Sequence, residues 1–600
     1  MKAPQTLNQL FFDAVDRYSS KRAAFQYKAG GAWHDLTHQE LARRVKQTAL
    51  GLLELGVRPG DRVAILSANR PEWAIADYAC LTARCMDVPI YPTLPAKQAA
   101  YILRDSGAVA VFVSDRAQYE KVAETRGEVP ALRHVILFDG TAEGPGVRTL
   151  QEVQALGAAA EGKHARYQPD ALAVSPGEVA TLIYTSGTTG DPKGVMLTHG
   201  NFVSNVLGAL QVLHIGPDDS ALSLLPLSHS FERMAGHYTM FHAGVTVAYA
   251  ESLDTVAANM VEVKPTIALA VPRLYEKIYA RVLENALSGG GLKRQIFFWA
   301  KRNAEAWAEL VLANQSVSAT LGAKKAIADR LVFSKLRART GGRIRFFVSG
   351  AAPLSADIAK FFYAAGMRII EGYGLTETSP VITVNPYEAP RLGAVGKAIP
   401  GVEVKIAPDG EILCRGPNVM KGYFNKPEAT REVIDADGWF HTGDIGELDA
   451  DGYLKITDRK KDIIVTAGGK NIAPQPIENL VKTNKWVLNA VMLGDKRKFP
   501  LMLVVPNPDA VAAWAKERGL PTADYGALLS NPDVAAKIER EVMANLRDLA
   551  SYETPKKLVL LKDDFTIESG ELTPTLKVKR RVVEKKYASE IEAAYRSGND

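Results

Sequence analysis

The segment from Tyr184 to Gly194 constrains the fold more than any other part of the sequence. It reads Tyr-Thr-Ser-Gly-Thr-Thr-Gly-Asp-Pro-Lys-Gly and directly follows the apolar run Val179–Ile183. This order predicts a β-strand that leads into a loop rich in glycine and hydroxyl groups. The backbone N–H groups of such a loop, together with Lys193, suit the oxygens of a polyphosphate. A plain glycine-rich surface turn is the alternative interpretation.

This loop differs from the P-loop of kinases and GTPases. In that motif a Gly-Lys-Ser/Thr sequence begins a helix, whereas here Pro192 precedes the lysine and Gly194 follows it. The sequence therefore predicts a phosphate-binding loop of a different kind.

Short apolar runs alternate with helical patterns on both sides of the loop, which predicts an α/β fold with mostly parallel sheets covered by helices. The expected strands include Val63–Leu66, Val88–Ile90, Val109–Val113, Val135–Phe138, Leu222–Leu225, Val245–Tyr249, Ile267–Ala270 and Ile344–Val348. Near residue 400 the pattern changes to short alternating strands with Asp-Gly turns, which indicates a β-subdomain. From Asp458 onward we expect a small, mobile α+β domain, so the predicted domains are 1–457 and 458–600.

Composition narrows the function classes. Six hundred residues exceed what one hydrophobic core usually organises, so at least two domains are expected. The net charge of +6, from 73 basic and 67 acidic residues, is too small at this length to argue for a nucleic-acid partner. The three cysteines lack partners at zinc-site spacing and are too few for a disulfide framework. We therefore expect a reducing, cytoplasmic setting, and the first residues contain no apolar core of signal-peptide length.

A second motif, Glu-Gly-Tyr-Gly-Leu-Thr-Glu at Glu371–Glu377, is more specific than the loop alone. Together the two motifs resemble the signatures of the acyl-adenylate-forming enzymes, which join a carboxylic acid to AMP, release pyrophosphate and mostly pass the acyl group to a thiol. The resemblance implies that Tyr373 stacks on adenine, that Thr376 bonds the α-phosphate, and that Glu377 and Thr185 hold Mg²⁺. When Mg²⁺ is bound to a nucleotide it needs oxygen ligands, and the protein often supplies only one or two of them. An exposed turn before a helix is the alternative.

Further residues match the same family by position. Asp444, in His-Thr-Gly-Asp, is suited to accept both ribose hydroxyl groups, and Arg459 and Lys461 match a basic pair near the ribose and phosphate. A solvated charge run is the alternative for that pair. The complete set of predicted ATP- and AMP-binding residues is Thr185, Ser186, Gly187, Thr188, Thr189, Lys193, Gly350, Ala351, Gly372, Tyr373, Thr376, Asp444, Arg459 and Lys461.

The C-terminal part of the sequence carries the expected moving parts. Lys577, in a stretch from Gly570 to Arg581, matches the lysine that acts with Thr376 and Glu377 in adenylation, although Thr-Leu-Lys replaces the common Ser-Gly-Lys. Lys579, two residues further on, leaves this assignment open. Asp458 matches the family's hinge, and Gly469 and Lys470 match a loop that lines the channel for the pantetheine arm of coenzyme A.

The acyl site is less clearly marked. His229, in Leu-Pro-Leu-Ser-His, matches a motif beside the substrate carboxylate, and Val271–Tyr279 resembles the long-chain fatty acyl-CoA synthetase branch. We therefore predict AMP-forming ligation of a long-chain fatty acid to coenzyme A, with Mg·ATP as cosubstrate. The alternatives are a fatty acyl-AMP ligase that loads a carrier protein, and a lipid-surface protein with a vestigial nucleotide site. The sequence is also compatible with a homodimer.

The region Leu292–Phe346 is strongly basic. Twelve lysines and arginines face only Glu305, Glu309 and Asp329, and apolar residues recur at helical spacing. A basic amphipathic helix of this kind can lie peripherally on an anionic membrane, here on the cytoplasmic face, although the sequence favours the other interpretation, which follows. The alternative is a helix whose apolar stripe packs on its own domain while its basic residues are solvated.

Overall fold

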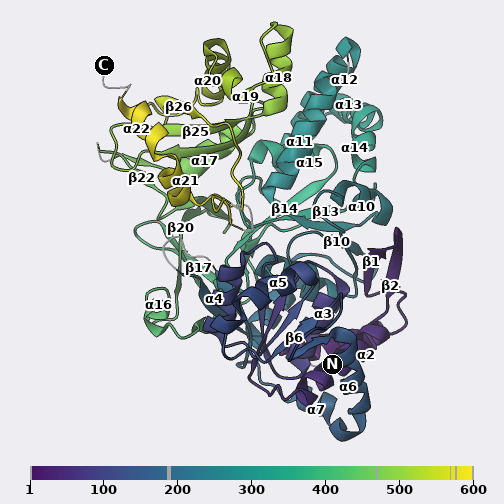
Figure 1. Ribbon diagram of the computed structural model, residues 1–600. Coiled ribbons are helices and arrows are strands. Elements are labelled where there is room, and N and C mark those ends of the chain that lie inside the picture. The colour runs from purple at the N-terminus through teal and green to yellow at the C-terminus, as the bar shows by residue number, and fades with distance from the viewer. Residues whose placement is uncertain are drawn as a thin grey trace.

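The computed structural model describes residues 3–185, 191–288, 290–467, 470–567, 569–573 and 577–596. Its larger part contains two large sheets with helices between and around them (Figure 1). The first is eight-stranded, in the order β19 (Gly422–Tyr423), β9 (Lys193–Thr198), β8 (Val179–Thr185), β4 (Met86–Ile90), β3 (Arg62–Leu66), β5 (Ala110–Val113), β6 (His134–Leu137) and β7 (Val147–Thr149). It is parallel from β8 to β7, whereas β9 and β19 run antiparallel to their neighbours.

The second sheet is nine-stranded and is parallel from β14 to β1. Its order is β16 (Lys397–Ala398), β15 (Val381–Val384), β14 (Arg368–Gly374), β13 (Phe346–Ser349), β12 (Ile267–Ala270), β10 (Ser220–Ser223), β11 (Thr246–Tyr249), β1 (Phe25–Ala29) and β2 (Ala32–Leu36). The α/β prediction is confirmed. The N-terminal hairpin β1–β2 and the division into two sheets were not predicted.

The alternation of side chains along β3 explains why its apolar run is continuous. Val63 and Ile65 point into the core between the two sheets, whereas Ala64 and Leu66 point into the core on the other face. Helix α3 (Pro71–Thr82) is buried on all sides because it lies in the first core. The same core contains residues of α1 (Leu7–Arg17), α2 (His38–Glu54), α8 (His199–Val212) and the π-helix η3 (Glu232–Thr239), and the second contains residues of α4 (Ala96–Ser106) and α5 (Arg116–Thr125).

The basic region predicted from sequence forms several helices rather than one. They project at the upper right of Figure 1, in teal. Their bounds are α12 (Gly290–Leu312), α13 (Ala319–Ala328), the π-helix η4 (Asp329–Phe333) and α14 (Ser334–Ala338). Helix α11 (Pro272–Leu287) precedes the region, and α15 (Ala356–Ala364) follows it and packs against α12.

The chain then forms the predicted β-subdomain and a smaller C-terminal unit. The subdomain is an antiparallel sheet in the order β17 (Glu403–Ile406), β18 (Glu411–Arg415), β20 (Phe440–Leu448) and β21 (Leu454–Arg459). The C-terminal unit has its own buried clusters, which begin at Ile464, whereas the preceding core ends at Ile456. Asp458 lies between these two positions, and its role as the domain boundary stays a prediction.

The C-terminal unit is α+β. Its elements are β22 (Ile464–Val465), β23 (Asn471–Ile472), α17 (Pro474–Lys482), β24 (Val487–Leu493), β25 (Leu501–Pro506), α18 (Pro508–Glu517), α19 (Tyr525–Leu529), α20 (Pro532–Asn545), β26 (Lys557–Leu560), α21 (Arg580–Lys586) and α22 (Ala588–Arg596). The remaining helices of the larger part include α6 (Leu150–Ala159), α7 (Tyr167–Leu172), α9 (Met240–His242), α10 (Val256–Val263) and α16 (Pro427–Arg431).

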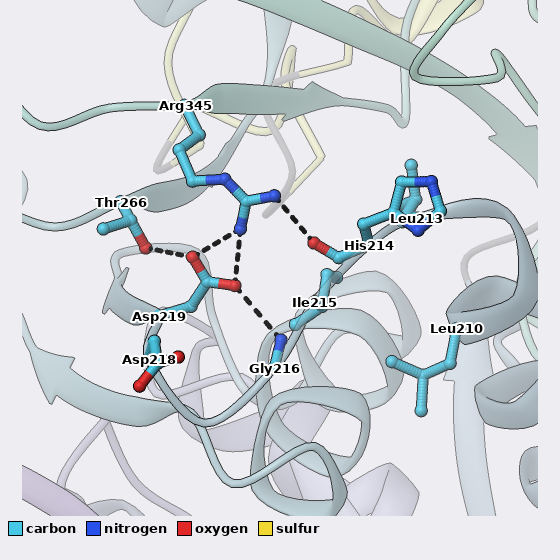
Figure 2. A pocket seen from close by; sticks show the side chains of 9 residues that line it. All are labelled: Leu210, Leu213, His214, Ile215, Gly216, Asp218, Asp219, Thr266 and Arg345. Carbon is cyan, nitrogen blue, oxygen red and sulfur yellow. Dashed lines mark hydrogen bonds and ion pairs between the residues drawn. The ribbon is translucent and has the colours of Figure 1, made fainter.

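A polar cluster closes the amino ends of three parallel strands (Figure 2). Arg345, just before β13, donates to both carboxylate oxygens of Asp219, at 2.6 and 2.7 Å, and Thr266 donates to the same carboxylate at 2.8 Å. These residues line a surface hollow of about 600 Å³. Because ligands of open α/β sheets bind at the carboxyl ends of strands, we regard this hollow as structural.

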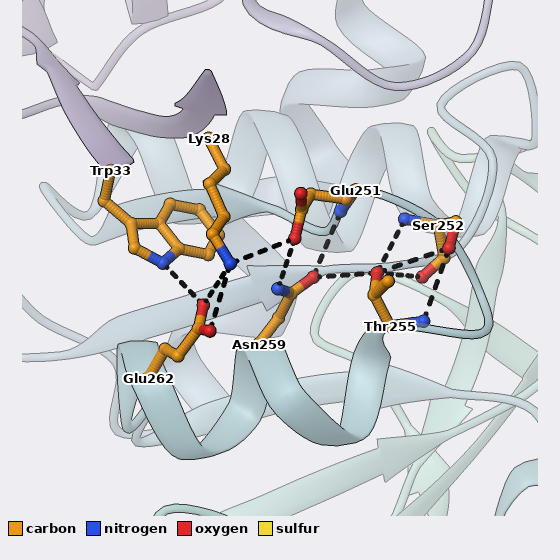
Figure 3. Close-up of polar contacts among 7 residues, drawn as sticks. All are labelled: Lys28, Trp33, Glu251, Ser252, Thr255, Asn259 and Glu262. Atoms are coloured by element: carbon orange, nitrogen blue, oxygen red, sulfur yellow. Dashed lines mark hydrogen bonds and ion pairs between the residues drawn. The ribbon is translucent and has the colours of Figure 1, made fainter. Parts of the chain in front are cut away.

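A second polar cluster fixes the edge hairpin β1–β2 to α10 (Figure 3). The indole of Trp33 donates to Glu262 at 2.9 Å, and Lys28 contacts the carboxylates of Glu262 and Glu251 at 2.9 and 3.3 Å. Charged groups of this kind discourage the exposed strand from pairing with another chain.

Among the residues that the structure describes, no helix has both the length and the hydropathy needed to cross a bilayer. Cys80, Cys85 and Cys414 are buried free thiols.

Candidate active site

The loop that follows β8 begins and ends on adjacent strands. Thr185, the last residue of β8, pairs with Lys193, the first of β9. The ammonium of Lys193 lies 4.9 Å from the ring centre of Tyr423. The intervening predicted phosphate-binding residues, Ser186, Gly187, Thr188 and Thr189, lie outside the described residues. The two ends of the predicted loop therefore lie where β8 reaches its carboxyl end.

The turn after β13 approaches the same region. A Cβ atom on Gly350 would lie 3.2 Å from the ring of Phe231, which explains the need for a small residue there. Ala351 has a φ of +69°, a left-handed conformation that costs an alanine about 1 kcal/mol or more. This backbone is therefore held by its surroundings.

The structure brings the predicted adenine-stacking tyrosine and the predicted ribose-binding carboxylate together. The hydroxyl of Tyr373, which follows Gly372 in β14, donates to Asp444 Oδ2 at 2.7 Å. Arg459 Nε lies 3.2 Å from the other oxygen of Asp444, because β20 and β21 pair these two residues directly. All three polar groups thus meet beside the carboxyl end of the nine-stranded sheet.

Thr376 and Glu377 follow β14 in a short helical turn, η5 (Thr376–Thr378). The hydroxyl oxygens of Thr376 and Ser230 are 3.2 Å apart. Glu377 Oε1 accepts a hydrogen bond from the hydroxyl of Tyr423 at 2.9 Å. Burial raises the pKa of Glu377, whereas that hydrogen bond and the nearby charges of Arg459 and Lys577 act to lower it.

Lys577 reaches this group of side chains from the C-terminal unit. Burial, followed by the charge of Arg459, lowers the pKa of Lys577 to about 8, whereas Asp444 and Glu377 oppose that shift. The ammonium therefore lies within electrostatic range of all three. Lys579 instead directly precedes α21, and its backbone N–H donates to Glu571 O at 2.7 Å.

His229 lies within electrostatic range of this ammonium. Burial and then the charge of Lys577 lower the pKa of His229 to about 3, so the ring is neutral at physiological pH. Its Nδ1 accepts from the N–H of Phe231 at 3.1 Å, which leaves the ring proton on Nε2. A neutral histidine that can donate from Nε2 suits a carboxylate ligand.

Three of the predicted residues lie apart from this group. Lys461 is exposed. Lys470 belongs to the C-terminal unit, where its ammonium lies 5.6 Å from the ring centre of Tyr552, and Gly469 lies outside the described residues. Asp458 is buried in β21; its Oδ1 accepts from the N–H of Arg459 at 2.6 Å, and burial raises its pKa to about 7.

One ion pair connects the larger part to the body of the C-terminal unit. Arg273, in the first turn of α11, lies 2.7 Å from Asp564. Asn489 donates to the other oxygen of Asp564 at 3.0 Å. Among the residues that the structure describes, this is the only ion pair that joins residues before 458 to residues after 462.

Two family models cover nearly all of the chain. The AMP-binding enzyme model matches residues 11–424, and the model of the AMP-binding enzyme C-terminal domain matches residues 461–599. The chain belongs to the AMP-binding enzyme family.

Curated relatives of this AMP-binding enzyme extend along nearly its whole length. The long-chain-fatty-acid–CoA ligase FadD15 of Mycobacterium bovis is 42% identical over 577 residues, which cover 95% of this chain and 94% of the relative. The peroxisomal long chain acyl-CoA synthetase 6 of Arabidopsis thaliana is 36% identical and covers 94% of this chain and 82% of its own.

A solved structure confirms the fold of this AMP-binding enzyme. The A domain of a carboxylic acid reductase from Segniliparus rugosus, in complex with AMP and a co-purified carboxylic acid, superimposes with a TM-score of 0.75 at 22% identity. The match covers 99% of this chain and 94% of that one.

Sequence reasoning missed several residues of this AMP-binding enzyme that contact the site. Tyr423 and Ser230 are uncharged, and no spacing marks them as partners of Glu377 and Thr376. Arg233 carries a charge, but its role depends on the fold. It is fully buried in η3, forms ion pairs with Asp77 and Asp87 in α3 and β4, and donates its backbone N–H to His229 O at 3.0 Å. It therefore fixes the turn that carries His229.

Proposed function

We propose that this AMP-binding enzyme is a long-chain fatty acid–CoA ligase that works through an acyl-adenylate. The observation that carries the proposal is that Lys577, from the C-terminal unit, lies within electrostatic range of Glu377 and Asp444, which come from two other distant parts of the chain. The names of the relatives support the choice of acid and thiol. The proposed units are a nucleotide- and acid-binding part, 1–457, and a lid, 458–600, that turns about Asp458.

The residues present fit a magnesium ion carried by ATP. No group of three or more His, Cys, Asp or Glu side chains that could hold a metal occurs within the described ranges. Such a cage is unnecessary, because Mg²⁺ on a nucleotide usually takes one or two protein oxygens and keeps water and phosphate ligands. Glu377 and Thr185 would hold it, and when bound it would neutralise charge on the phosphates.

In the proposed first step, the fatty acid carboxylate attacks the α-phosphorus of ATP and pyrophosphate leaves. Negative charge develops on the attacking and bridging oxygens, and the ammonium of Lys577 stabilises both without transferring a proton. His229 donates to the carboxylate from Nε2, Thr376 bonds the α-phosphate and Asp444 accepts from the ribose. Arg459, which pairs with Asp444, is the basic residue that completes the proposed nucleotide site.

In the proposed second step, the lid turns, withdraws Lys577 and brings the loop of Gly469 and Lys470 to the pantetheine channel. The thiol of coenzyme A then attacks the acyl carbonyl and AMP leaves. Closed states before and after the turn protect the mixed anhydride from water. A carrier-protein acceptor is the alternative, and thioester formation with free coenzyme A would reject it.

We expect kcat/KM to rise with the chain length of the acid. An apolar tunnel gains about 0.8 kcal/mol for each methylene that it buries. Pyrophosphate exchange measured with acids from acetate to oleate tests this expectation, with benzoate and an amino acid as controls. Equal or better turnover of acetate, benzoate or the amino acid would reject the long-chain assignment while leaving adenylation intact.

We also propose a cytoplasmic enzyme whose α12 touches the anionic face of a membrane. Leu292 and Phe298 are 72% and 37% exposed on this helix. Phe298, Arg294 and Arg302 line a hollow of about 410 Å³. Lys301, by contrast, lies 2.8 Å from Glu305 and belongs to an internal ion pair. Arg294 and Arg302 form no ion pair with a carboxylate that the structure describes. Apolar side chains beside such cations match the chemistry of an anionic lipid surface.

The membrane proposal predicts salt-sensitive binding to vesicles that contain phosphatidylglycerol. Neutralising Lys293, Arg294 and Arg302 together to glutamine should weaken co-sedimentation, because each cation near such a surface contributes about 1 kcal/mol. Neutralising three exposed cations of the C-terminal unit, Lys516, Arg540 and Arg547, changes the net charge equally and should have little effect. Equal sedimentation of both variants and the parent would reject the proposal and favour a solvated helix face.

A further inference from the structure

Tyr423 lies beside the strand that returns from the predicted phosphate loop. It belongs to β19, which pairs antiparallel with β9, so that Tyr423 stands opposite Val195. On either side of it, the N–H of Lys421 donates to Met196 O at 3.0 Å and that of Phe424 donates to Gly194 O at 2.8 Å. The position of Tyr423 is therefore tied to the end of the loop.

The same short segment holds Glu377. The N–H of Met420 donates to the backbone oxygen of Glu377 at 2.8 Å, and the hydroxyl of Tyr423 donates to its Oε1 at 2.9 Å. One carboxylate oxygen is thereby occupied, and the side chain is held in one orientation. The other oxygen, Oε2, would then be the one to bind a metal ion.

The ring of Tyr423 contacts the loop lysine as well. The ammonium of Lys193 lies 4.9 Å from the ring centre, within the range of a cation–π interaction. One buried side chain therefore touches the group expected to receive the metal and the group expected to receive phosphate. Phenylalanine would keep the second contact and lose the first, whereas leucine would lose both.

We propose that Tyr423 is a positioning residue that orients Glu377 for Mg²⁺ and Lys193 for the phosphates of ATP. This inference rests on the proposed function. A metal-binding carboxylate that a partner already holds in place loses less conformational entropy when the ion binds. Loss of such partners typically lowers metal affinity ten- to a hundredfold.

Equilibrium binding of ATP tests the inference without turnover, because no fatty acid is present. Isothermal titration calorimetry would measure ATP affinity over a range of Mg²⁺ concentrations and in EDTA. For Tyr423→Phe we expect a roughly tenfold rise in the Mg²⁺ concentration that gives half of the full increase in ATP affinity, with ATP affinity in EDTA unchanged. For Tyr423→Leu we expect the same rise and weaker binding in EDTA as well, because Lys193 also loses its support.

Tyr453→Phe is the matched control. Tyr453 is also buried, donates its hydroxyl to a backbone oxygen, Ala389 O, at 2.7 Å, and carries Arg391 over its ring at 4.1 Å. No hydrogen bond or ring contact joins its side chain to a predicted site residue that the structure describes. We expect this variant to bind ATP and Mg²⁺ as the parent does.

Combining Tyr423→Phe with Glu377→Gln should add nothing to the effect of Glu377→Gln alone.

The outcomes separate this inference from the proposed function. If Glu377→Gln leaves the Mg²⁺ dependence unchanged, the proposed metal role fails. If Glu377→Gln changes it but Tyr423→Phe does not, only the role of Tyr423 fails. If Tyr423→Phe weakens ATP binding equally with Mg²⁺ and in EDTA, the hydroxyl of Tyr423 has only a structural role and the inference is overturned. The same holds if Tyr453→Phe weakens ATP binding as much as Tyr423→Phe does.

Discussion

Lys577→Ala is expected to lower acyl-adenylate formation by about two to three orders of magnitude, the usual loss for one charge-stabilising group. The ammonium of Lys577 acts on the same site as Glu377 and Asp444, where the α-phosphorus would be attacked. In the proposed mechanism its charge serves the first half-reaction only, because the lid would then carry it away. Pyrophosphate exchange should therefore fall, whereas conversion of pre-made acyl-adenylate and coenzyme A to thioester should stay nearly intact.

Lys579→Ala is the matched control for this result. Both residues are lysines of the same segment, but no described contact joins the side chain of Lys579 to Glu377, Asp444 or Arg459. A defect in pyrophosphate exchange for Lys579→Ala but not for Lys577→Ala would shift the assignment by two residues. Equal loss of both half-reactions in Lys577→Ala would argue against a lid that alternates between them.

Asp458→Pro is expected to have the opposite effect. Proline fixes φ near −65°, so the backbone at the proposed hinge could not turn. Adenylation should continue, and thioester formation from pre-made acyl-adenylate should fall strongly. Separate assays of the two half-reactions measure this.

Asp458→Ala controls for the loss of the side chain. It removes the buried carboxylate and its hydrogen bond to the N–H of Arg459 but leaves φ free. Thermal unfolding of both variants would detect damage to β21. If Asp458→Ala and Asp458→Pro lose thioester formation equally at the same stability, the carboxylate rather than the turn matters, and the hinge proposal fails.

Local apolar patterns predicted the framework well. The strand expected at Ile267–Ala270 has these bounds in β12, because its side chains are buried on both faces. The strand expected at Leu222–Leu225 ends two residues earlier, at Ser223, where the chain turns toward Pro226 and the motif of His229. Such ends depend on tertiary packing, which a local pattern does not record.

The sequence could not predict which charges would find partners. In the basic region, Lys301, Lys325, Arg337 and Arg345 form ion pairs with Glu305, Asp329, Asp329 and Asp219. Arg345 and Asp219 are far apart in the chain and meet only because β10, β12 and β13 align their amino ends. The contact of Tyr423 with Glu377 has the same origin, since β19 is brought to β9 by the fold.

The ion pair between Arg273 and Asp564, the only one described between the larger part and the body of the C-terminal unit, has a consequence for the resting state of the proposed lid. Both side chains are about a quarter exposed, at 28% and 27%, and such pairs usually contribute about 0–1 kcal/mol. An energy of that size changes the ratio of two conformations by about fivefold at most. This ion pair alone therefore favours the arrangement with Lys577 inserted only slightly, and we expect the substrates bound at each stage to decide which arrangement of the proposed lid prevails.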